Sequence, residues 1–99
     1  MRVIAKPALI DFYTQHSQAK EQLLAWWKTA KNARWANIIE VRRNYPTAEA
    51  AGRLTIFNVC GNKYRLLSRI DYARQIIWIR NVLTHAEYDK EEWKHDPWY

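Results

Sequence analysis

Three stretches in the second half of the chain have the spacing of apolar and polar residues that is typical of β-strands. Residues 54–59 form a short, mostly apolar run that ends at Gly61-Asn62, a pair suited to a tight hairpin turn. Residues 63–70 alternate between the two sides of a strand, and residues 75–83 are almost continuously apolar. We therefore expect three neighbouring strands, with the last one buried on both sides.

The middle strand of this predicted sheet has one basic side. Its side chains fall into two sets, Tyr64, Leu66, Ser68 and Ile70 on one side and Lys63, Arg65, Leu67 and Arg69 on the other. The alternation predicts that one face of the sheet presents positive charge.

Arg80 interrupts the apolar run of the third strand, so its charge must be paired or must face an opening. If Asp71 lies opposite Gln75 across the second turn, Arg80 falls opposite Leu66, on the side away from Arg65. One bulge residue in that turn would instead bring Arg80 beside Arg65.

A competing interpretation gives the basic residues separate roles. Arg65 and Arg69 would form a solvated outer face, and Arg80 would pair with a carboxylate such as Glu40 or Glu87. The sequence leaves both interpretations open.

The first half of the chain has the three- and four-residue spacing of helices. A helix is predicted from Pro7 to about His16, and a second one, capped by Ser17, has an expected buried stripe of Leu23, Leu24, Trp27 and Ala30. A shorter helix covers about residues 35–42 and ends before Pro46. Met1–Ala5 is expected to be a short strand, and Thr47–Arg53 a connector into the sheet.

These elements predict one α+β domain, residues 1–99, because a chain of 99 residues can bury only one core. The first two helices would cover one face of the sheet. Trp26, Trp27, Trp35 and Trp78 are expected in the core or at an interface. Near the C-terminus, the aromatic side chains of Trp93, Trp98 and Tyr99 could stack on RNA, pack back on the domain or contact a partner protein, and the sequence does not decide among these.

A short helix should follow the third strand directly. Thr84 and Glu87 have the spacing of a capping box, which places the helix start at or beside Thr84. The free backbone N–H groups of its first turn would form an anion site at the end of the sheet. His85 and Tyr88, three residues apart, would share one face of this helix.

The charge balance favours a polyanionic partner. Sixteen Lys and Arg against ten Asp and Glu leave a net charge of +6 and a pI near 9.7. Nine of the basic residues are arginines, and five of these lie between Arg53 and Arg80, which favours nucleic acid over a membrane surface.

The cysteine content and the hydropathy of the chain indicate its cellular compartment. The single cysteine, Cys60, excludes an internal disulfide and a cysteine-based zinc cage, which fits a reducing compartment. The opening residues lack the pattern of a signal peptide, and no run of about twenty apolar residues occurs. We expect a cytoplasmic protein without a metal site or cofactor.

Three segments, MRVIAKPALIDFY, FNVCGNKYRLLSRI and IIWIRNVLTHAEYD, resemble the HigB branch of the RelE-like bacterial toxins, and THAEYD is the most specific of these matches. The resemblance implies a RelE-like fold, with helices packed on a twisted, mainly antiparallel sheet. It also implies a ribonuclease of a type II toxin–antitoxin pair that cuts mRNA, commonly on the translating ribosome. A helix-turn-helix antitoxin of the HigA type would silence it.

The same resemblance implies site residues. Arg65 would grip the scissile phosphate, Tyr88 would be the tyrosine of the last helix, and His85 matches the histidine of the motif. The flanking residues expected to bind RNA are Lys63, Arg69, Arg80 and Asp89.

The expected mechanism uses no metal ion. The RNA 2′-hydroxyl would attack the adjacent phosphate, with His85 as base or acid, Tyr88 orienting the hydroxyl, and Arg65 and Arg80 stabilising the transition state. A second proton carrier is not evident, because His16 lies on the first helix and His95 in the tail.

Two other function classes fit the same pattern. A gyrase-poisoning toxin of related fold would use the basic sheet without needing His85 or Tyr88. A non-catalytic RNA-binding module would need the basic sheet with exposed aromatic side chains on it.

Overall fold

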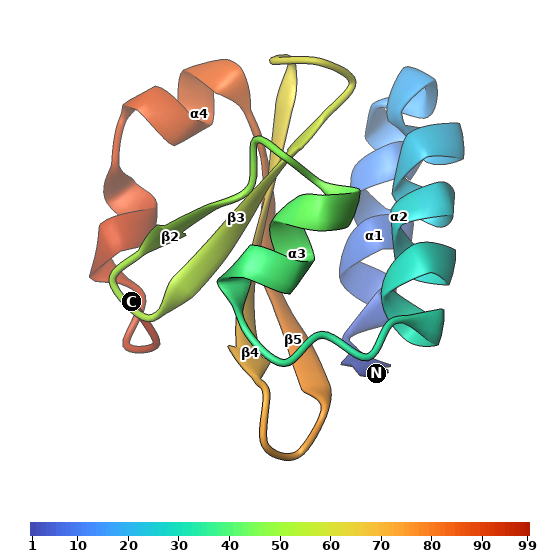
Figure 1. The fold of residues 1–99 in the computed structure, drawn as a ribbon. Helices are drawn as coiled ribbons and strands as arrows, with labels where there is room; N and C mark the ends of the chain where they lie inside the picture. Colours follow the sequence, from blue (N-terminus) through green and yellow to red (C-terminus); the bar gives the residue numbers. More distant parts are fainter.

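The computed structural model describes residues 1–99 and contains a five-stranded sheet in the order β1-β5-β4-β3-β2 (Figure 1). The strands are β1 (Arg2–Ile4), β2 (Glu49–Ala51), β3 (Leu54–Val59), β4 (Tyr64–Asp71) and β5 (Ile76–Thr84). β1 runs parallel to β5, and every other pair is antiparallel. The three strands predicted from the alternation are confirmed as β3, β4 and β5, and the α+β class is confirmed with them.

The helices are α1 (Lys6–Gln15), α2 (Lys20–Asn32), α3 (Ile38–Asn44) and α4 (His85–Asp89), with 3₁₀ turns η1 (Ser17–Ala19) and η2 (Glu92–His95). The predicted strand at the N-terminus is confirmed as β1. The predicted connector of residues 47–53 is wrong in part, because β2 lies within it and pairs with β3. The longest helix, α2, has 13 residues, and no helix reaches the length and hydropathy of a membrane span.

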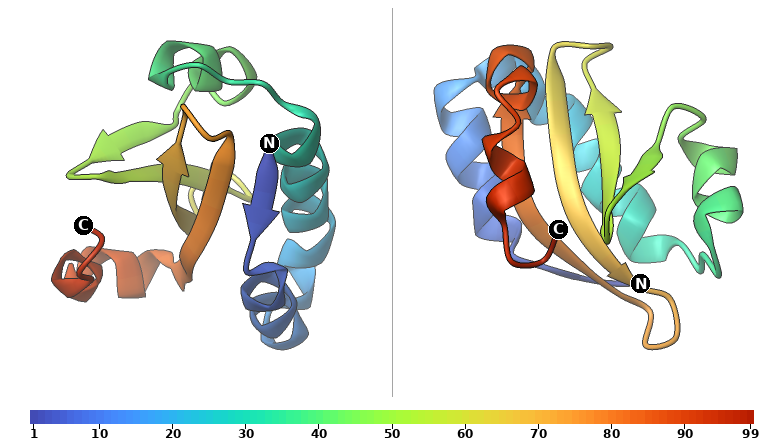
Figure 2. Two further views of the ribbon diagram at one scale, coloured as in Figure 1. Left: turned by 90° about the horizontal axis from the view of Figure 1, so that it is seen from below. Right: turned by 90° about the vertical axis from the view of Figure 1, so that its left-hand side faces the viewer.

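One face of the sheet, here called the helix face, carries Tyr64 and Leu66 and packs on α1 and α2 (Figure 2). The core between these layers contains Leu9, Leu23 and Phe57, each fully buried. Burial of this apolar area is the main stabilising contribution to the fold.

The buried stripe of α2 differs from the prediction. Leu23, Trp26 and Ala30 are buried, whereas Trp27 is only half-buried, with the ammonium groups of Lys6 and Lys31 over its ring at 4.0 and 4.8 Å. Adjacent tryptophans fit either stripe at helical spacing, so the pattern alone could not choose between Trp26 and Trp27.

The opposite face of the sheet, here called the outer face, carries Arg65, Leu67 and Arg69. It is not open along its length, because the C-terminal segment (residues 90–99) packs on it (Figure 2). Leu67 and Trp93 belong to a second, smaller core there. Of the three uses considered for the C-terminal aromatic residues, packing back on the domain is the one observed.

The end of the C-terminal segment is fixed beside the turn between β2 and β3. Arg53 donates from Nε to the Tyr99 carbonyl oxygen at 3.1 Å and from Nη2 to the Pro97 carbonyl oxygen at 2.8 Å. Gly52 has a φ of +58°, and a Cβ atom there would lie 2.9 Å from the Tyr99 ring. Glycine is therefore required at this position both by the turn and by the close contact.

The register of β4 and β5 settles the position of Arg80. Leu67 pairs with Asn81 and Ser68 with Ile79, which leaves Arg80 as the extra residue of a β-bulge. Asp71 pairs with Ile76, so the turn holds one residue more than the Asp71–Gln75 register would give, and the alternative that puts Arg80 on the face of Arg65 is confirmed. The Arg80 side chain accordingly reaches the C-terminal segment on the outer face.

Candidate active site

α4 is fixed against the β3–β4 hairpin at one end of the sheet. Glu87 N–H donates to Thr84 Oγ1 at 3.2 Å, and Thr84 N–H donates to Glu87 Oε1 at 2.9 Å, which confirms the predicted capping box. His85 N–H donates to the Lys63 carbonyl oxygen at 2.8 Å. These bonds occupy the N–H groups of His85 and Glu87, two of the donors that the predicted anion site at the helix start would need.

The capping box also affects the charge of Glu87. The hydrogen bond from the Thr84 backbone lowers the pKa of the Glu87 carboxyl, and this effect outweighs the opposing effect of burial. Glu87 therefore remains ionised near neutral pH and stabilises the helix start.

Arg65 lies at the centre of this end of the sheet and is only 8% exposed. Its Nη1 donates to the carbonyl oxygens of Asn62 at 2.9 Å and Tyr64 at 3.2 Å. No carboxylate forms an ion pair with it. The guanidinium is therefore held in one orientation while its charge stays available to an anion.

His85 lies beside Arg65 and is open to solvent, with 53% of its side chain exposed. Its Nδ1 is 3.4 Å from Arg65 Nη2, and its Nε2 is 3.1 Å from Asp89 Oδ2. Arginine can only donate, so among the two tautomers of the neutral imidazole these neighbours favour the one with the proton on Nε2 and a lone pair on Nδ1. In this form Nδ1 can accept a proton.

Tyr88, one helical turn after His85 in α4, is the third residue at this end of the sheet. Its ring lies 5.1 Å from the Arg65 guanidinium and stacks on Trp93 with ring centroids 5.1 Å apart. The hydroxyl donates to Glu49 Oε1 at 3.0 Å. Burial, followed by the contact with Glu49, raises the pKa of Tyr88 to about 12, so the phenol keeps its proton at neutral pH.

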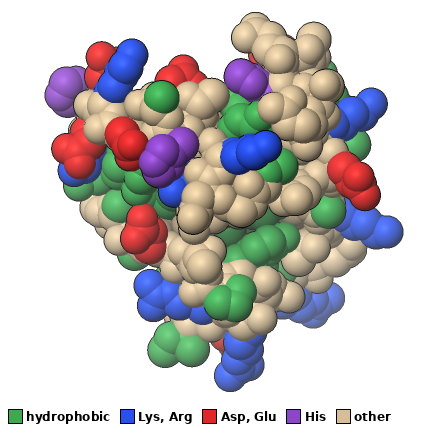
Figure 3. Space-filling view, turned by 90° about the horizontal axis from the view of Figure 1, so that it is seen from above, with side chains coloured by type: hydrophobic (Ala, Val, Ile, Leu, Met, Phe, Trp, Pro, Cys, Tyr) green, Lys and Arg blue, Asp and Glu red, His purple; other side chains and the backbone are tan.

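The other predicted site residues lie in different surroundings. Lys63 is exposed on the hairpin where α4 begins, and Asp89 contacts His85. Arg69 lies farther along β4, near Trp78 and Trp98. The site thus brings together Arg65, His85, Tyr88 and Asp89, with Lys63 at its edge. Figure 3 shows this end of the molecule, where histidine side chains lie beside acidic and basic ones.

Arg80 lies outside this group and is paired within the fold. Its Nε donates to Asp96 Oδ2 and its Nη2 to Asp96 Oδ1, both at 3.0 Å. The Trp98 ring lies 4.1 Å from its guanidinium. The expectation that Arg80 pairs with a carboxylate is therefore confirmed, but the carboxylate is Asp96 rather than Glu40 or Glu87.

Two residues near the site were not predicted from the sequence. Glu49 reaches Tyr88 from β2, a strand that the apolar pattern did not reveal. His16 stacks on Phe12 at 4.4 Å and lies 5.5 Å from the Tyr64 ring, on the helix face of the sheet. Its position in the apolar stripe of the first helix predicted that His16 packs on the domain. The sequence did not predict that His16 lies near Glu87 of α4.

This arrangement suits chemistry at a phosphate ester. It combines a buried cation, an imidazole with an accepting nitrogen, a carboxylate that orients the imidazole, and a phenol that remains protonated. These groups come from β4 and α4, whose relative position is fixed by the hairpin and the capping box.

Known proteins are similar in sequence to this chain along most of its length. Residues 19–91 match the HigB toxin family model, described as a RelE-like toxic component of a toxin–antitoxin system. The chain is 29% identical over 92 residues to the mRNA interferase toxin HigB of Escherichia coli and to the mRNA interferase HigB of Shigella flexneri. Each alignment covers 90% of this chain and 88% of the relative. The chain therefore belongs to the HigB family of RelE-like toxins.

Proposed function

We propose that this protein is an mRNA interferase, an endoribonuclease toxin that cuts mRNA without a metal ion. The observation that carries the proposal is Arg65, a buried guanidinium held by two backbone carbonyl oxygens and paired with no carboxylate. A cation fixed in this way can stabilise the charge that develops on a phosphate during cleavage. The names of the relatives, mRNA interferases, support the same activity.

In the proposed reaction, His85 Nδ1 takes the proton of an RNA 2′-hydroxyl. The 2′-oxygen then forms a bond to the adjacent phosphorus, and the bond from phosphorus to the 5′-oxygen of the next nucleotide breaks. The products are a 2′,3′-cyclic phosphate and a free 5′-hydroxyl. Arg65 stabilises the phosphorane-like transition state, and exposed Lys63 adds charge at the edge of the site.

The leaving 5′-oxygen needs a proton, and Tyr88 is the proposed donor. A phenol with a pKa of about 12 keeps its proton at neutral pH, so the proton is available for transfer to the leaving oxygen. Asp89 serves His85 by keeping the proton on Nε2, and it stabilises the imidazolium that forms. Arg80 has no role at the phosphate in this proposal, because Asp96 occupies its guanidinium.

The partners follow from the same proposal. Membership of a toxin–antitoxin family implies an antitoxin, and we propose a helix-turn-helix protein of the HigA type. We further propose that the substrate is mRNA on the translating ribosome in the cytoplasm. A neighbouring reading frame that encodes a helix-turn-helix protein would support the antitoxin assignment.

The activity is tested by adding purified protein to a translating lysate and mapping the ends of the mRNA fragments. We expect 5′-hydroxyl ends from the parent protein and no cuts from Arg65→Ala protein of unchanged secondary structure. Growth arrest on expression provides a second readout. If a His85→Ala/Tyr88→Phe protein arrests growth as strongly as the parent, the ribonuclease assignment is wrong, and a target such as gyrase must be considered.

A further inference from the structure

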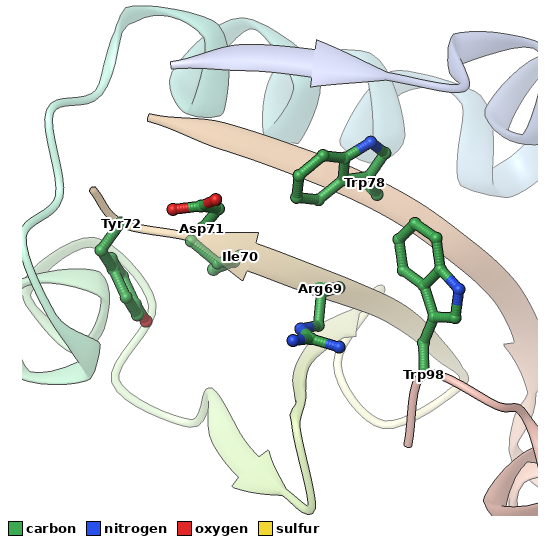
Figure 4. Close-up of a pocket in the computed structure, with 6 residues that line it drawn as sticks. All are labelled: Arg69, Ile70, Asp71, Tyr72, Trp78 and Trp98. Atoms are coloured by element: carbon green, nitrogen blue, oxygen red, sulfur yellow. The ribbon is translucent and has the colours of Figure 1, made fainter. Parts of the chain in front are cut away.

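A hollow of about 420 Å³ lies on the sheet beyond the candidate active site. It is lined by the far end of β4, by β5 and by the C-terminal segment, through Arg69, Ile70, Asp71, Tyr72, Trp78 and Trp98 (Figure 4). β3 pairs with β4 only as far as Ser68, so from Arg69 to Asp71 the β4 strand has β5 on one side and no neighbouring strand on the other. The volume falls in the range of small-ligand sites.

Two tryptophans form an aromatic corner in this hollow. The rings of Trp78 and Trp98 are 5.6 Å apart and nearly perpendicular, at 82°. Trp98 is fixed in place because Arg80 lies 4.1 Å from its ring and its backbone N–H donates to Asp96 Oδ1 at 2.8 Å. Both indoles are half-buried, so each still presents ring surface to the solvent.

Arg69 supplies the free charge of the hollow. Its guanidinium forms no hydrogen bond and no ion pair. Asp71, in contrast, is occupied within the turn, where its carboxylate accepts from the Arg74 backbone N–H at 3.0 Å. An unpaired arginine beside exposed indole surface is the combination that binds single-stranded nucleic acid, by stacking on bases and contacting phosphates.

The hollow is also aligned with the candidate active site. Arg65 and Arg69 lie on the same strand and the same face, four residues and therefore about 13 Å apart. An extended RNA strand with its phosphate at Arg65 would pass over the C-terminal segment, which covers Leu67 between the two arginines, and would reach Arg69 a few nucleotides away. The net charge of +6 favours the same polyanion.

We propose that this hollow binds an unpaired nucleobase of the RNA, stacked on Trp98, with Arg69 contacting the adjoining phosphate or the base edge. The inference rests on the proposed function for the identity of the ligand. It adds a second point of contact, remote from the reacting phosphate, and gives Arg80 and Asp96 the role of positioning Trp98.

The test measures binding of a short single-stranded RNA that carries a 2′-deoxynucleotide at the cleavage position. Arg69→Gln is the first variant, because Arg69 holds no other part of the fold. Arg43→Gln is its matched control, since Arg43 is equally basic, is exposed on α3 and forms no ion pair. We expect Arg69→Gln to weaken binding several-fold more than Arg43→Gln.

Trp98 is tested by a pair of substitutions. Trp98→Ala should weaken binding about tenfold or more, the loss expected for one stacked base, and Trp98→Phe should restore most of it. An RNA that lacks one base at the contacted position should bind the parent and the Trp98→Ala protein alike. The last comparison separates a lost stacking contact from a displaced C-terminal segment.

The outcomes separate this inference from the proposed function. If Arg69→Gln and Trp98→Ala proteins bind RNA as the control does while the parent still cuts mRNA, the nucleobase site is wrong and the ribonuclease stands. If the parent binds the RNA through Trp98 but cuts no mRNA, the nucleobase site stands and the ribonuclease is wrong.

Discussion

Arg65 has the surroundings of a residue retained for chemistry rather than for stability. A buried cation without a carboxylate partner is costly, on the order of several kcal/mol, unless hydrogen bonds offset the loss of water. Here the carbonyl oxygens of Asn62 and Tyr64 orient the guanidinium without cancelling its charge. Arg80 differs, because its guanidinium donates hydrogen bonds to both oxygens of the Asp96 carboxylate.

The contact between His85 and Asp89 leads to the first prediction. Asp89→Asn keeps a side chain of the same shape but removes the charge that stabilises a protonated imidazole, so the cleavage rate should fall about tenfold or more. The measurement is a single-turnover cleavage rate at saturating protein. Glu92→Gln, which removes a nearby exposed charge with no partner, should leave the rate unchanged, and equal rates for both variants would exclude this role of Asp89.

Tyr88 and Glu49 give a prediction about ionisation. The raised pKa of Tyr88, about 12, comes first from burial and then from Glu49. Glu49→Gln should therefore lower the pKa of Tyr88 while leaving it above the ordinary value of 10.0. An ultraviolet titration of tyrosinate, with Tyr88→Phe protein as the reference, measures this shift. A Tyr88 pKa that Glu49→Gln leaves unmoved would contradict the contact.

At the scale of elements, α4 depends on local bonds, because five residues are too few for a helix to be stable alone. The capping box and the bond from His85 N–H to Lys63 O fix its direction. The spacing of Thr84 and Glu87 made this element predictable from the sequence. β2 was not predictable, because three residues of mixed polarity give no alternation to read.

Glu87 should make the stabilisation of α4 depend on pH. A carboxyl whose pKa is lower in the folded protein stabilises the fold above its unfolded pKa, and the contribution is lost as the pH falls through the folded pKa. Glu87→Gln keeps an accepting oxygen but loses the charge, so it should cost about 0.3–1 kcal/mol at pH about 7 and less at pH about 3. Urea unfolding at the two pH values measures the difference.

Asp11→Asn serves as the control for Glu87, because Asp11 is exposed in the middle of α1 and makes no ion pair. It should change the free energy of unfolding only slightly at either pH. A loss of stability in the Glu87→Gln protein that is equal at both pH values would contradict the assignment.

At the scale of the whole molecule, the sheet lies between two layers. The periodicity of the apolar residues predicted α1 and α2 on the helix face. It could not predict the second layer, because residues 90–99 lack a repeat and are held by contacts with Arg53, Arg80 and Gly52, which are distant in the sequence. The bulge at Arg80 was hidden for a related reason, since the apolar run of β5 continues on both sides of it.

The second layer should depend on the pair of Arg80 and Asp96. Asp96→Asn removes the charge from a contact with two hydrogen bonds, so the free energy of unfolding should fall by about 1.5–3 kcal/mol. Trypsin should also cut after Lys94 faster than in the parent. Asp11→Asn, an exposed change on α1, is the control, and a variant that matches it in both measurements would show that the pair does not hold the segment.

The central claim is that Arg65 stabilises the transition state of RNA cleavage, and the single-turnover cleavage rate of Arg65→Lys and Arg65→Ala proteins tests it most directly. Lysine keeps the charge but loses the forked geometry, so we expect its rate to lie well below that of the parent and above that of alanine. Arg74→Ala, measured beside them, should cut like the parent. Melting temperatures would confirm that each variant is folded. A folded Arg65→Ala protein that cuts mRNA as fast as the parent would contradict the account.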